Sequence, residues 1–477
     1  MWLRVRAGRR DFPLSVFLCL SSVNVFHPIV NNPFSCGENH MRKVKRPNRG
    51  IKSRRHRGWV STAARFLLCT ATLGWAQEYR VTSPLTFEQA VLKSLHSHPE
   101  LAGYQHQLDA ANARAAQAGI GPRPQLGLEV EDVAGTGDFS GVESAQTTLG
   151  ISWLLQGELL NQRVTTARSK TAVIERQRQI LELDVAADTA RYFLQAMAQQ
   201  ERLVLALSAA EQARNALVDI RRQVNAGKVP QADASRAEAE LERYALAAED
   251  IEHELEISRH RLAAQWGERS PGFGEIAGSL SSPIPFIDVA QLRAQVADNP
   301  NVAIFLSRER VVDAEIALAR AEAGVQWRID VGIRRLEATD DYGLVAGVGI
   351  PIGRRGRNRS ELAALAAEQS RYRAEMNAKA LELETRVYTM AQQLLHSRHV
   401  AEALSARIIP SLERAEADTR AAYRLGKYSY YELVAAQQQL IDARLSFLET
   451  QYRAHLYLIE LEKLTGLSLT QISERGK

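Results

Sequence analysis

Two acidic residues in matching positions are the side chains best suited to act on ions. Glu432 and Asp233 each lie six residues after a glycine, at Gly426 and Gly227. A ring of such carboxylates at a narrow opening would attract cations and repel anions. Both positions also suit the first turn of a helix: "SYYE", which ends at Glu432, is a capping box, and Asp233 closely follows Pro230. Both roles stay open for Glu432, whereas we favour the helix cap for Asp233.

Other residue types with chemical potential do not form a recognisable site. The sequence contains no phosphate-binding glycine loop, no HExxH motif and no nucleophile elbow. Three histidines (His96, His98 and His106) are spaced by two and eight residues, whereas ligands that share one helix face are about four apart. We therefore expect a solvated helix surface there, no metal site, no cofactor and no enzymatic activity.

The first 76 residues differ from the rest in charge. They hold 14 of the 60 Lys and Arg residues but only 2 of the 55 Asp and Glu residues, so the remainder carries a net charge of −7. The basic character belongs to this leader and does not indicate a nucleic-acid partner. All three cysteines (Cys19, Cys36 and Cys69) also lie there, which excludes disulfides and thiolate metal sites from residues 77–477.

Within this leader, residues 41–76 have the order of a signal peptide. A basic stretch precedes a short apolar run, and a small-x-small site ends at Ala76. We predict that translation begins at Met41 and that residues 1–40 are upstream sequence. A leucine directly before Cys69 argues against lipidation, because a lipoprotein signal has a small residue there. The signal predicts export.

The exported part repeats itself. "QVNAGKVPQADASRAEAELERYALAAED" begins at Gln223 and "AYRLGKYSYYELVAAQQQLIDARLSFLE" begins at Ala422, and their turn glycines are 199 residues apart. Upstream, Pro99 matches Pro300 in a second similar pair of segments. A period of this size indicates duplication of a half-molecule. We expect a first repeat at 77–266, a linker rich in Gly, Ser and Pro at 267–286, a second repeat at 287–470 and a tail at 471–477.

Each repeat contains a very long helix. Between about Leu159 and Ala226 there is no proline and no glycine, and strong helix formers dominate. Some 65 residues at a rise of 1.5 Å make a rod about 100 Å long. The counterpart, roughly Asn358 to Leu425, is about as long. Such rods predict extended antiparallel coiled coils. On the helices alone, a soluble periplasmic coiled-coil adaptor or spacer is the better hypothesis.

The segments between the helices change that interpretation. In "VQWRIDVGIRR" at 325–335 and "YGLVAGVGIPI" at 342–352, apolar residues alternate with polar residues and glycine, and the first repeat shows a weaker version near 125–130 and 148–153. Such strands have two different faces and suffice to cross a bilayer when tilted. Four strands cannot close a transmembrane barrel, so the chain must oligomerise if these strands are in a membrane. We expect Arg328, Asp330 and Arg334 to face the lumen.

The arrangement resembles the TolC-like outer-membrane efflux protein family over nearly all of residues 84–470. The resemblance rests on "LTFEQAVLKSLHSHPEL", "ARAAQAGIGPRPQLGLEVE" and "YRLGKYSYYELVAAQQQLIDARLSFL" together with the duplicated layout. "ISWLLQGELLNQRVTTA" at 151–167 is more similar to the heavy-metal, CzcC-like branch. The predicted fold is mainly α, with an α-barrel tunnel and four strands per chain of a shared β-barrel.

The resemblance implies a homotrimer in outer-membrane lipid that extends into the periplasm. It would be the exit duct of a tripartite efflux system, fed by a periplasmic adaptor and an inner-membrane transporter of the RND type, and heavy-metal cations would be its substrates. A duct for type I protein secretion is the alternative in the same class.

The resemblance also assigns roles to the hairpin tips. Acidic residues at the second tip help to line the closed mouth, and Tyr423 joins the network that holds it shut. Tyr428 and Ala435 stand where related drug ducts have an arginine and a second aspartate, so the gate of this chain differs in detail. Adaptors dock on such tips, which here carry two Gly-Lys pairs: Gly227 and Lys228, and Gly426 and Lys427.

Overall fold

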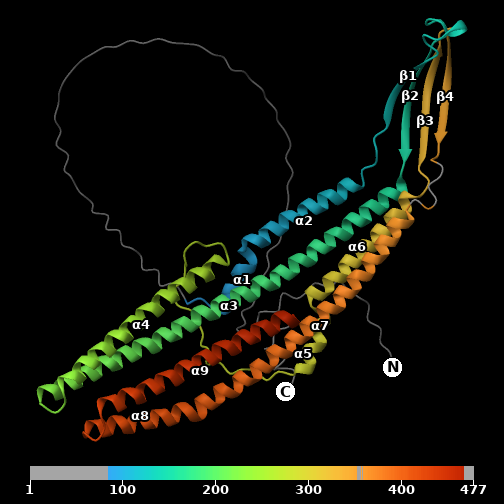
Figure 1. Cartoon of the computed structure of the whole chain (residues 1–477). Coiled ribbons are helices and arrows are strands. Elements are labelled where there is room, and N and C mark those ends of the chain that lie inside the picture. Colours follow the sequence, from blue (N-terminus) through green and yellow to red (C-terminus); the bar gives the residue numbers. More distant parts are fainter. Residues whose placement is uncertain (1–83, 352–355, 357, 467–477) are drawn as a thin grey trace, which may run out of the picture. The chain divides into compact units, whose positions relative to one another are not determined.

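The computed structural model describes residues 84–351, 356 and 358–466 (Figure 1), all of which fall in one compact unit. The proposed upstream sequence, the signal peptide with all three cysteines, and the tail at 471–477 lie outside the described residues. Residues 352–355 and 357 do so as well.

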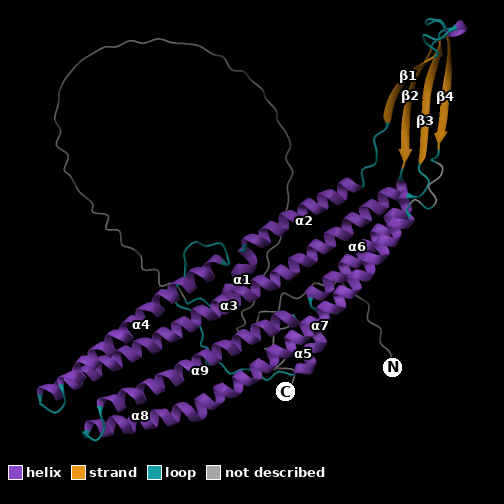
Figure 2. Cartoon of the chain, in the orientation of Figure 1, coloured by secondary structure: helices purple, strands orange, loops and turns teal. Residues whose placement is uncertain are grey.

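Two similar series of elements follow one another along the chain (Figure 2). The first contains α1 (Phe87–Ser97), α2 (Pro99–Ala118), β1 (Gln125–Glu131), the 3₁₀ turn η2 (Gly137–Phe139), β2 (Gln146–Leu155), α3 (Gly157–Asn225) and α4 (Gln231–Ala264). The second contains α5 (Val289–Gln295), η3 (Val296–Asp298), α6 (Pro300–Glu322), β3 (Trp327–Leu336), β4 (Asp341–Gly349), α7 (Arg359–Ala403), the π-helix η4 (Leu404–Ile408), α8 (Ile409–Arg424) and α9 (Tyr430–Thr465). The predicted fold class is confirmed.

The first long helix follows directly from composition. α3 runs for 69 residues without a break, and alanine is the most frequent residue at its buried positions. It packs against α4 on one side and against α1, α2, α6 and α9 along its length. At 1.5 Å per residue its two ends lie about 100 Å apart. The sheet therefore joins one end of α3, and the turn into α4 lies at the other.

The second long helix is not the uninterrupted rod that the sequence suggested. Five residues of π-helix, Leu404–Ile408, separate α7 from α8, and Pro410 follows them. Proline has no amide hydrogen and its ring clashes with the carbonyl four residues earlier, so the regular hydrogen-bond ladder cannot continue through this point. The extra residue per turn in a π-helix absorbs the mismatch.

Two apolar clusters form the core where the repeats meet. One cluster centres on Phe193, Leu262 and Trp266 and includes Ile276 and Leu280 from the linker. The other joins α5, α7 and α9, with Leu292, Val387, Leu394 and Leu461 at its centre. Residues of α9 contribute to both clusters, so this helix ties the second repeat to the first.

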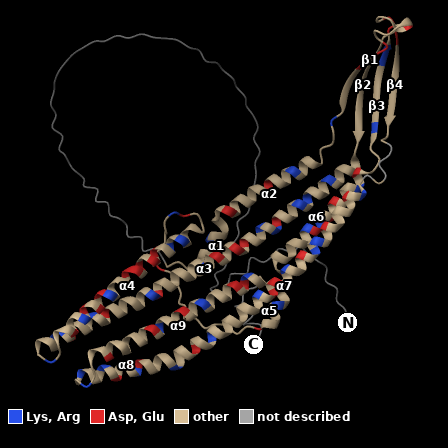
Figure 3. Cartoon of the chain, in the orientation of Figure 1, with Lys and Arg blue, Asp and Glu red and all other residues tan. Residues whose placement is uncertain are grey.

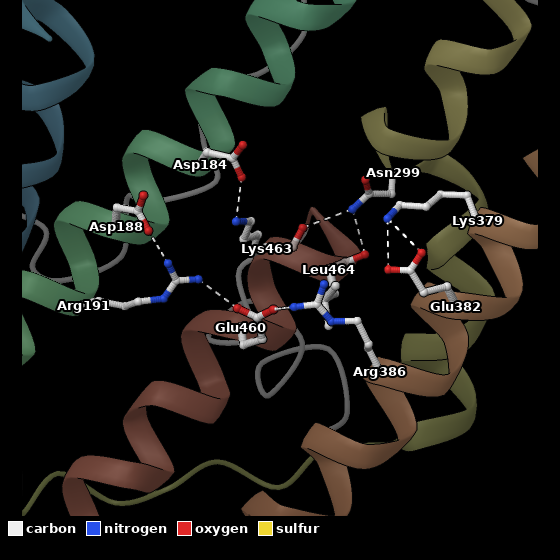
Figure 4. A network of polar contacts seen from close by, with 10 residues as sticks. All are labelled: Asp184, Asp188, Arg191, Asn299, Lys379, Glu382, Arg386, Glu460, Lys463 and Leu464. Atoms are coloured by element: carbon white, nitrogen blue, oxygen red, sulfur yellow. Dashed lines mark hydrogen bonds and ion pairs between the residues drawn. The ribbon is translucent and has the colours of Figure 1, made fainter. Parts of the chain in front are cut away.

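Ion pairs reinforce the same junction (Figure 4). The carboxylate of Glu460 on α9 lies between Arg191 of α3, at 2.9 Å, and Arg386 of α7. One turn later, Lys463 pairs with Asp184 of α3 at 2.6 Å. The long helices α3, α7 and α9, which come from both repeats, are therefore joined by ion pairs as well as by apolar contacts.

Asn299 adds buried hydrogen bonds to this junction. Its side chain is almost fully buried and donates to the carbonyl oxygens of Lys463, at 3.1 Å, and Leu464, at 2.8 Å. Its carbonyl oxygen Oδ1 accepts from the Asn301 amide at 2.8 Å, so the same residue caps the start of α6. One side chain thereby satisfies backbone groups at two helix ends.

The four strands form one antiparallel sheet in the order β1-β2-β3-β4. Each repeat contributes one hairpin, as the sequence indicated, and β2 pairs with β3 over ten residues to join the two. None of the described helices combines the length and apolar character needed to cross a membrane. Charged residues of both signs cover these helices, whereas few lie on the strands (Figure 3).

Candidate functional site

One face of the sheet is apolar across all four strands. The register aligns Leu128, Leu149, Ile333 and Leu344 in one row. The next row contains Leu126, Ile151, Val331 and Ala346. Nearly all of these large side chains are exposed, and Leu344 is 86% exposed. A monomer in water rarely presents an apolar patch of this extent, so the face requires an apolar surrounding.

Aromatic residues mark both ends of this apolar face. Trp153 and Trp327 lie toward the helices, whereas Tyr342 lies next to the β3–β4 turn. Amphipathic rings at both limits of an apolar band are typical of strands that cross from one membrane interface to the other. The pattern matches the strand interpretation made from sequence.

The opposite face is polar and rich in glycine. Gly127, Gly150 and Gly332 form a row across three strands, flanked by a row that contains Asp330 and a row that contains Arg334. A Cβ added at Gly332 would lie 2.9 Å from the Leu149 carbonyl oxygen, so only glycine fits between these backbones.

Arg334 is held firmly on this polar face. Its guanidinium donates to Thr148 Oγ1 and Gln146 Oε1, both at 2.9 Å, and pairs with Glu131 at 2.8 Å. Asp330 and Arg328 lie on the same face and make no ion pair with any described residue. The three residues predicted to face the lumen therefore share one side of the sheet.

Both outer edges of the sheet are open. β1 pairs only with β2, and β4 pairs only with β3, so neither outer edge is bonded to another described strand. Unpaired N–H and C=O groups at such edges cannot remain in hydrocarbon, where each costs several kcal/mol. A second strand must cover each edge if the apolar face is in lipid.

At the far ends of the long helices, two matching turns expose the Gly-Lys pairs. Gly227 and Gly426 have φ of +67° and +69°, the left-handed conformation that glycine adopts most easily. In each turn the glycine amide donates at 2.9 Å to a carbonyl three residues back, and the next lysine amide donates at 2.9 Å to one five residues back. This is the helix-ending motif that requires glycine, and Lys228 and Lys427 are exposed in it.

Glu432 has the complete geometry of a capping box. Its Oε2 accepts from the Ser429 amide at 2.7 Å and from the Ser429 hydroxyl at 2.9 Å, while its own amide donates to Ser429 Oγ at 3.3 Å. The amide bond, and then the hydroxyl bond, lower the pKa of this carboxyl. The side chain is thus a fully charged, exposed carboxylate whose Oε1 makes no hydrogen bond to a described residue. The gate role stays a prediction.

Asp233 and Tyr428 differ in their surroundings. Asp233 lies in the first turn of α4, is partly buried and contacts Arg236 at 3.6 Å. Tyr428 is exposed in the turn before α9. The structure of one chain does not bring Asp233, Tyr428 and Glu432 into a common cluster.

Tyr423 is buried between the two hairpins instead. Its ring packs against Tyr430, with centroids 6.3 Å apart, and against Leu217 and Ile220 of α3 and Ala234 of α4. Burial raises the pKa of Tyr423, and it raises the pKa of Tyr430 to about 12. Sequence analysis missed Tyr430, although its place as the first residue after the Ser429 cap could have marked it.

A groove of about 430 Å³ separates the two hairpins near their turns. Ile220, Tyr423 and Leu433 contribute to its apolar part, and its charged lining residues are Asp219, Arg222, Lys228, Arg420 and Arg424. Arg222 pairs with Asp219, and Arg420 pairs with Glu416. Lys228 and Arg424 pair with no described residue, so the groove carries two uncompensated positive charges.

Comparison with known proteins gives a consistent result. Residues 91–268 match the family described as outer membrane efflux protein. The chain is 25% identical over 387 residues to the cobalt-zinc-cadmium resistance protein CzcC of Cupriavidus metallidurans, which covers 80% of this chain and 90% of that protein. It is 23% identical over 297 residues to the nickel and cobalt resistance protein CnrC of the same organism, covering 62% and 70%.

Among solved structures, a crystal structure of CusC has the same fold, with a TM-score of 0.64, 16% identity, and coverage of 81% of this chain and 93% of that one. The resemblance to TolC-like outer-membrane efflux proteins is thereby confirmed. The predicted function, an outer-membrane efflux channel that extends into the periplasm, is also confirmed.

Proposed function

We propose that three copies of this outer-membrane efflux channel close a twelve-stranded barrel and conduct divalent metal cations that an inner-membrane pump delivers through a periplasmic adaptor. The observation that carries the barrel is a sheet with one apolar face, one polar face and two open edges. Four strands are too few to close, because the smallest transmembrane barrels have about eight. Pairing β4 of one copy with β1 of the next removes both edges at once.

The dimensions of the sheet fit a bilayer. β2 and β3 each have ten residues, which extend about 34 Å along the strand. At a tilt of about 40° this spans about 26 Å, close to the apolar band of about 25 Å in outer-membrane barrels. Arg328, Asp330 and Arg334 then line the water-filled interior, and the apolar rows contact lipid. The alternative hypothesis, a periplasmic spacer without a membrane part, does not explain why the apolar rows are exposed.

The trimer is tested by sizing the detergent extract of the outer membrane. We expect a heat-sensitive species of three chains, which dissociates to one chain on boiling. A monomer or dimer in mild detergent, in a sample that still conducts ions in planar bilayers, would contradict the twelve-stranded closure.

Metal cations are favoured as cargo by the two relatives that are named for cobalt, zinc, cadmium and nickel resistance. Among the described residues no group of three or more metal-ligating side chains forms a selective site, so the transporter would choose the substrate. The test expresses the channel with its pump and adaptor in a host that lacks its own ducts, and measures growth in Zn²⁺, Co²⁺ and Cd²⁺. Tolerance should rise. No change in tolerance, together with secretion of a protein substrate, would instead establish the type I secretion duct.

The hairpin tips are the proposed docking surface for the adaptor. Gly227, Lys228, Gly426 and Lys427 are exposed, and the groove beside them presents the unpaired charges of Lys228 and Arg424. Photo-crosslinkers placed at Lys228 and Lys427 should capture the adaptor in cells, whereas one at Lys379 on α7 should not. Equal capture at all three positions would remove the docking role and leave the glycines as helix ends.

The second proposed role of the tips is to close the periplasmic opening. Three copies of Glu432 would form a ring of charged carboxylates, with Asp233, Tyr423 and Tyr428 as supporting residues. The low pKa and the solvent exposure of Glu432 favour a permanently charged ring. No step of this proposal involves covalent chemistry, so the chain acts as a passive duct.

A further inference from the structure

Four metal-ligating side chains form a stripe on α4. Glu249, His253, Glu256 and His260 are spaced by four, three and four residues. At 100° per residue all four lie within a 60° sector of the helix surface. The helix buries Ala248, Leu255 and Leu262 on another side, where it packs against α3. The stripe therefore faces away from the packed side, and all four of its side chains are exposed.

The stripe consists of two similar pairs. Nε2 of His253 lies 3.9 Å from Oε1 of Glu249, and Nε2 of His260 lies 4.0 Å from Oε1 of Glu256. A zinc ion with bonds of about 2.0–2.2 Å holds two neighbouring ligands about 3.3 Å apart. Small rotations of these exposed side chains would bring each pair to that separation. An open groove at this place is lined by His253, Glu256, Ile257, His260 and Arg261.

We propose that each of these pairs binds one divalent transition-metal cation of the zinc class on the outside of α4. The imidazole nitrogen and the carboxylate oxygen supply two ligands, both of types that zinc accepts, and water completes the coordination. No group of three or more metal-ligating residues gathers at one point among the described residues, so both sites are open two-ligand sites with fast exchange. Equivalent positions of the two pairs are seven residues apart, which places the ions about 10 Å from each other.

This proposal goes beyond the duct function and does not depend on it, because all four side chains belong to one helix and are exposed in the single chain. The competing explanation is that each His–Glu pair at this spacing only stabilises the helix slightly. The two explanations differ in one measurable respect: only the first predicts saturable metal binding with a defined stoichiometry.

The test uses the full-length mature channel in detergent and Zn²⁺ as the probe, with binding measured by calorimetry at neutral pH. We expect saturable binding that includes two stripe sites per chain. His253→Ala and His260→Ala should each reduce the bound Zn²⁺ by one ion per chain, and the double variant should reduce it by two. Glu249→Gln should weaken one site about tenfold or more, because even outer-shell changes at metal sites cost 10–100-fold.

Glu254→Gln is the matched control, since Glu254 lies on the same helix and is exposed but points about 100° away from His253. Glu254→Gln should still bind Zn²⁺ at both stripe sites. With Cu²⁺ as a second probe, two bound ions should broaden each other's electron paramagnetic resonance lines, and either histidine variant should sharpen them. Unchanged Zn²⁺ stoichiometry in the double histidine variant, with helix content preserved by circular dichroism, would overturn the proposal.

Discussion

Placing an arginine on each face of the sheet tests the membrane position of the strands. Leu344 is 86% exposed in one chain, so in water its replacement by arginine should change stability by less than about 0.5 kcal/mol. In lipid the same change, near the middle of β4, should cost about 2–4 kcal/mol per chain. At 1.36 kcal/mol per tenfold change, this is about a 30- to 900-fold shift in the insertion equilibrium. Leu344→Arg should therefore reduce the heat-sensitive trimer in outer-membrane fractions severely.

The matched control is the neighbouring residue on the opposite face. Val345 lies opposite Gly332 in the register, in the row of glycines on the polar face of the sheet. Val345→Arg should assemble normally and change only the conductance measured in planar bilayers. For both variants, the stability of the trimer in liposomes is measured as the urea concentration at which it dissociates. If Leu344→Arg and Val345→Arg assemble equally well, the apolar rows do not contact lipid and the barrel proposal is wrong.

Three further substitutions test the core, a partly buried histidine and the tip. Asn299→Ala leaves two carbonyl oxygens near the end of α9 without their donor and removes the cap of α6, so we expect a loss of about 2–4 kcal/mol, measured by urea unfolding of the mature chain. Burial lowers the pKa of His455, whose Nε2 lies 3.0 Å from the Leu280 carbonyl oxygen. The unfolded chain therefore takes up a proton before the folded chain does, so stability is full above about pH 6.5 and decreases as pH falls toward the lowered pKa. His455→Gln should flatten this decrease in melting temperature between pH 7 and 5; an unchanged slope would exclude His455 as its source. Glu432→Gln retains a capping acceptor but removes the charge, so we expect reduced cation selectivity in planar bilayers with little change in melting temperature, and unchanged selectivity would eliminate the gate role.

Local patterns in the sequence were sufficient to predict the strands and the turns. The alternation around Ile329 and Val331 fixes which side chains share a face, because successive residues of a strand point to opposite sides. Gly227 and Gly426 mark helix ends, because the left-handed turn conformation strongly favours glycine. Each of these inferences depends only on residues that are close to each other in the sequence.

Contacts between distant segments could not be predicted in this way. Nothing local indicates that Tyr423 packs against α3 of the other repeat, because the same tyrosine on an isolated helix would serve equally well as a surface residue. Asn299 was overlooked for the same reason: its value as a cap for α9 depends on a helix end 164 residues away. Pro410 was visible in the sequence, but whether the chain would break, kink or form a π-helix depends on how α7 and α9 pack.

The two repeats share one topology but differ in how their hairpins are held together. The α3–α4 hairpin buries apolar residues, mostly alanines, along much of its length. In contrast, α8 buries only Glu416 and Tyr423 among its described residues, and it is joined to α9 mainly by polar contacts such as Arg444–Glu413 at 2.8 Å. Exposed ion pairs of this kind contribute about 0–1 kcal/mol each, less than buried apolar side chains. The two repeats thus share their elements, whereas in the described part of the chain the π-helix and the polar face of α8 occur only in the second of them. We therefore expect a lower local stability for the second hairpin than for the first.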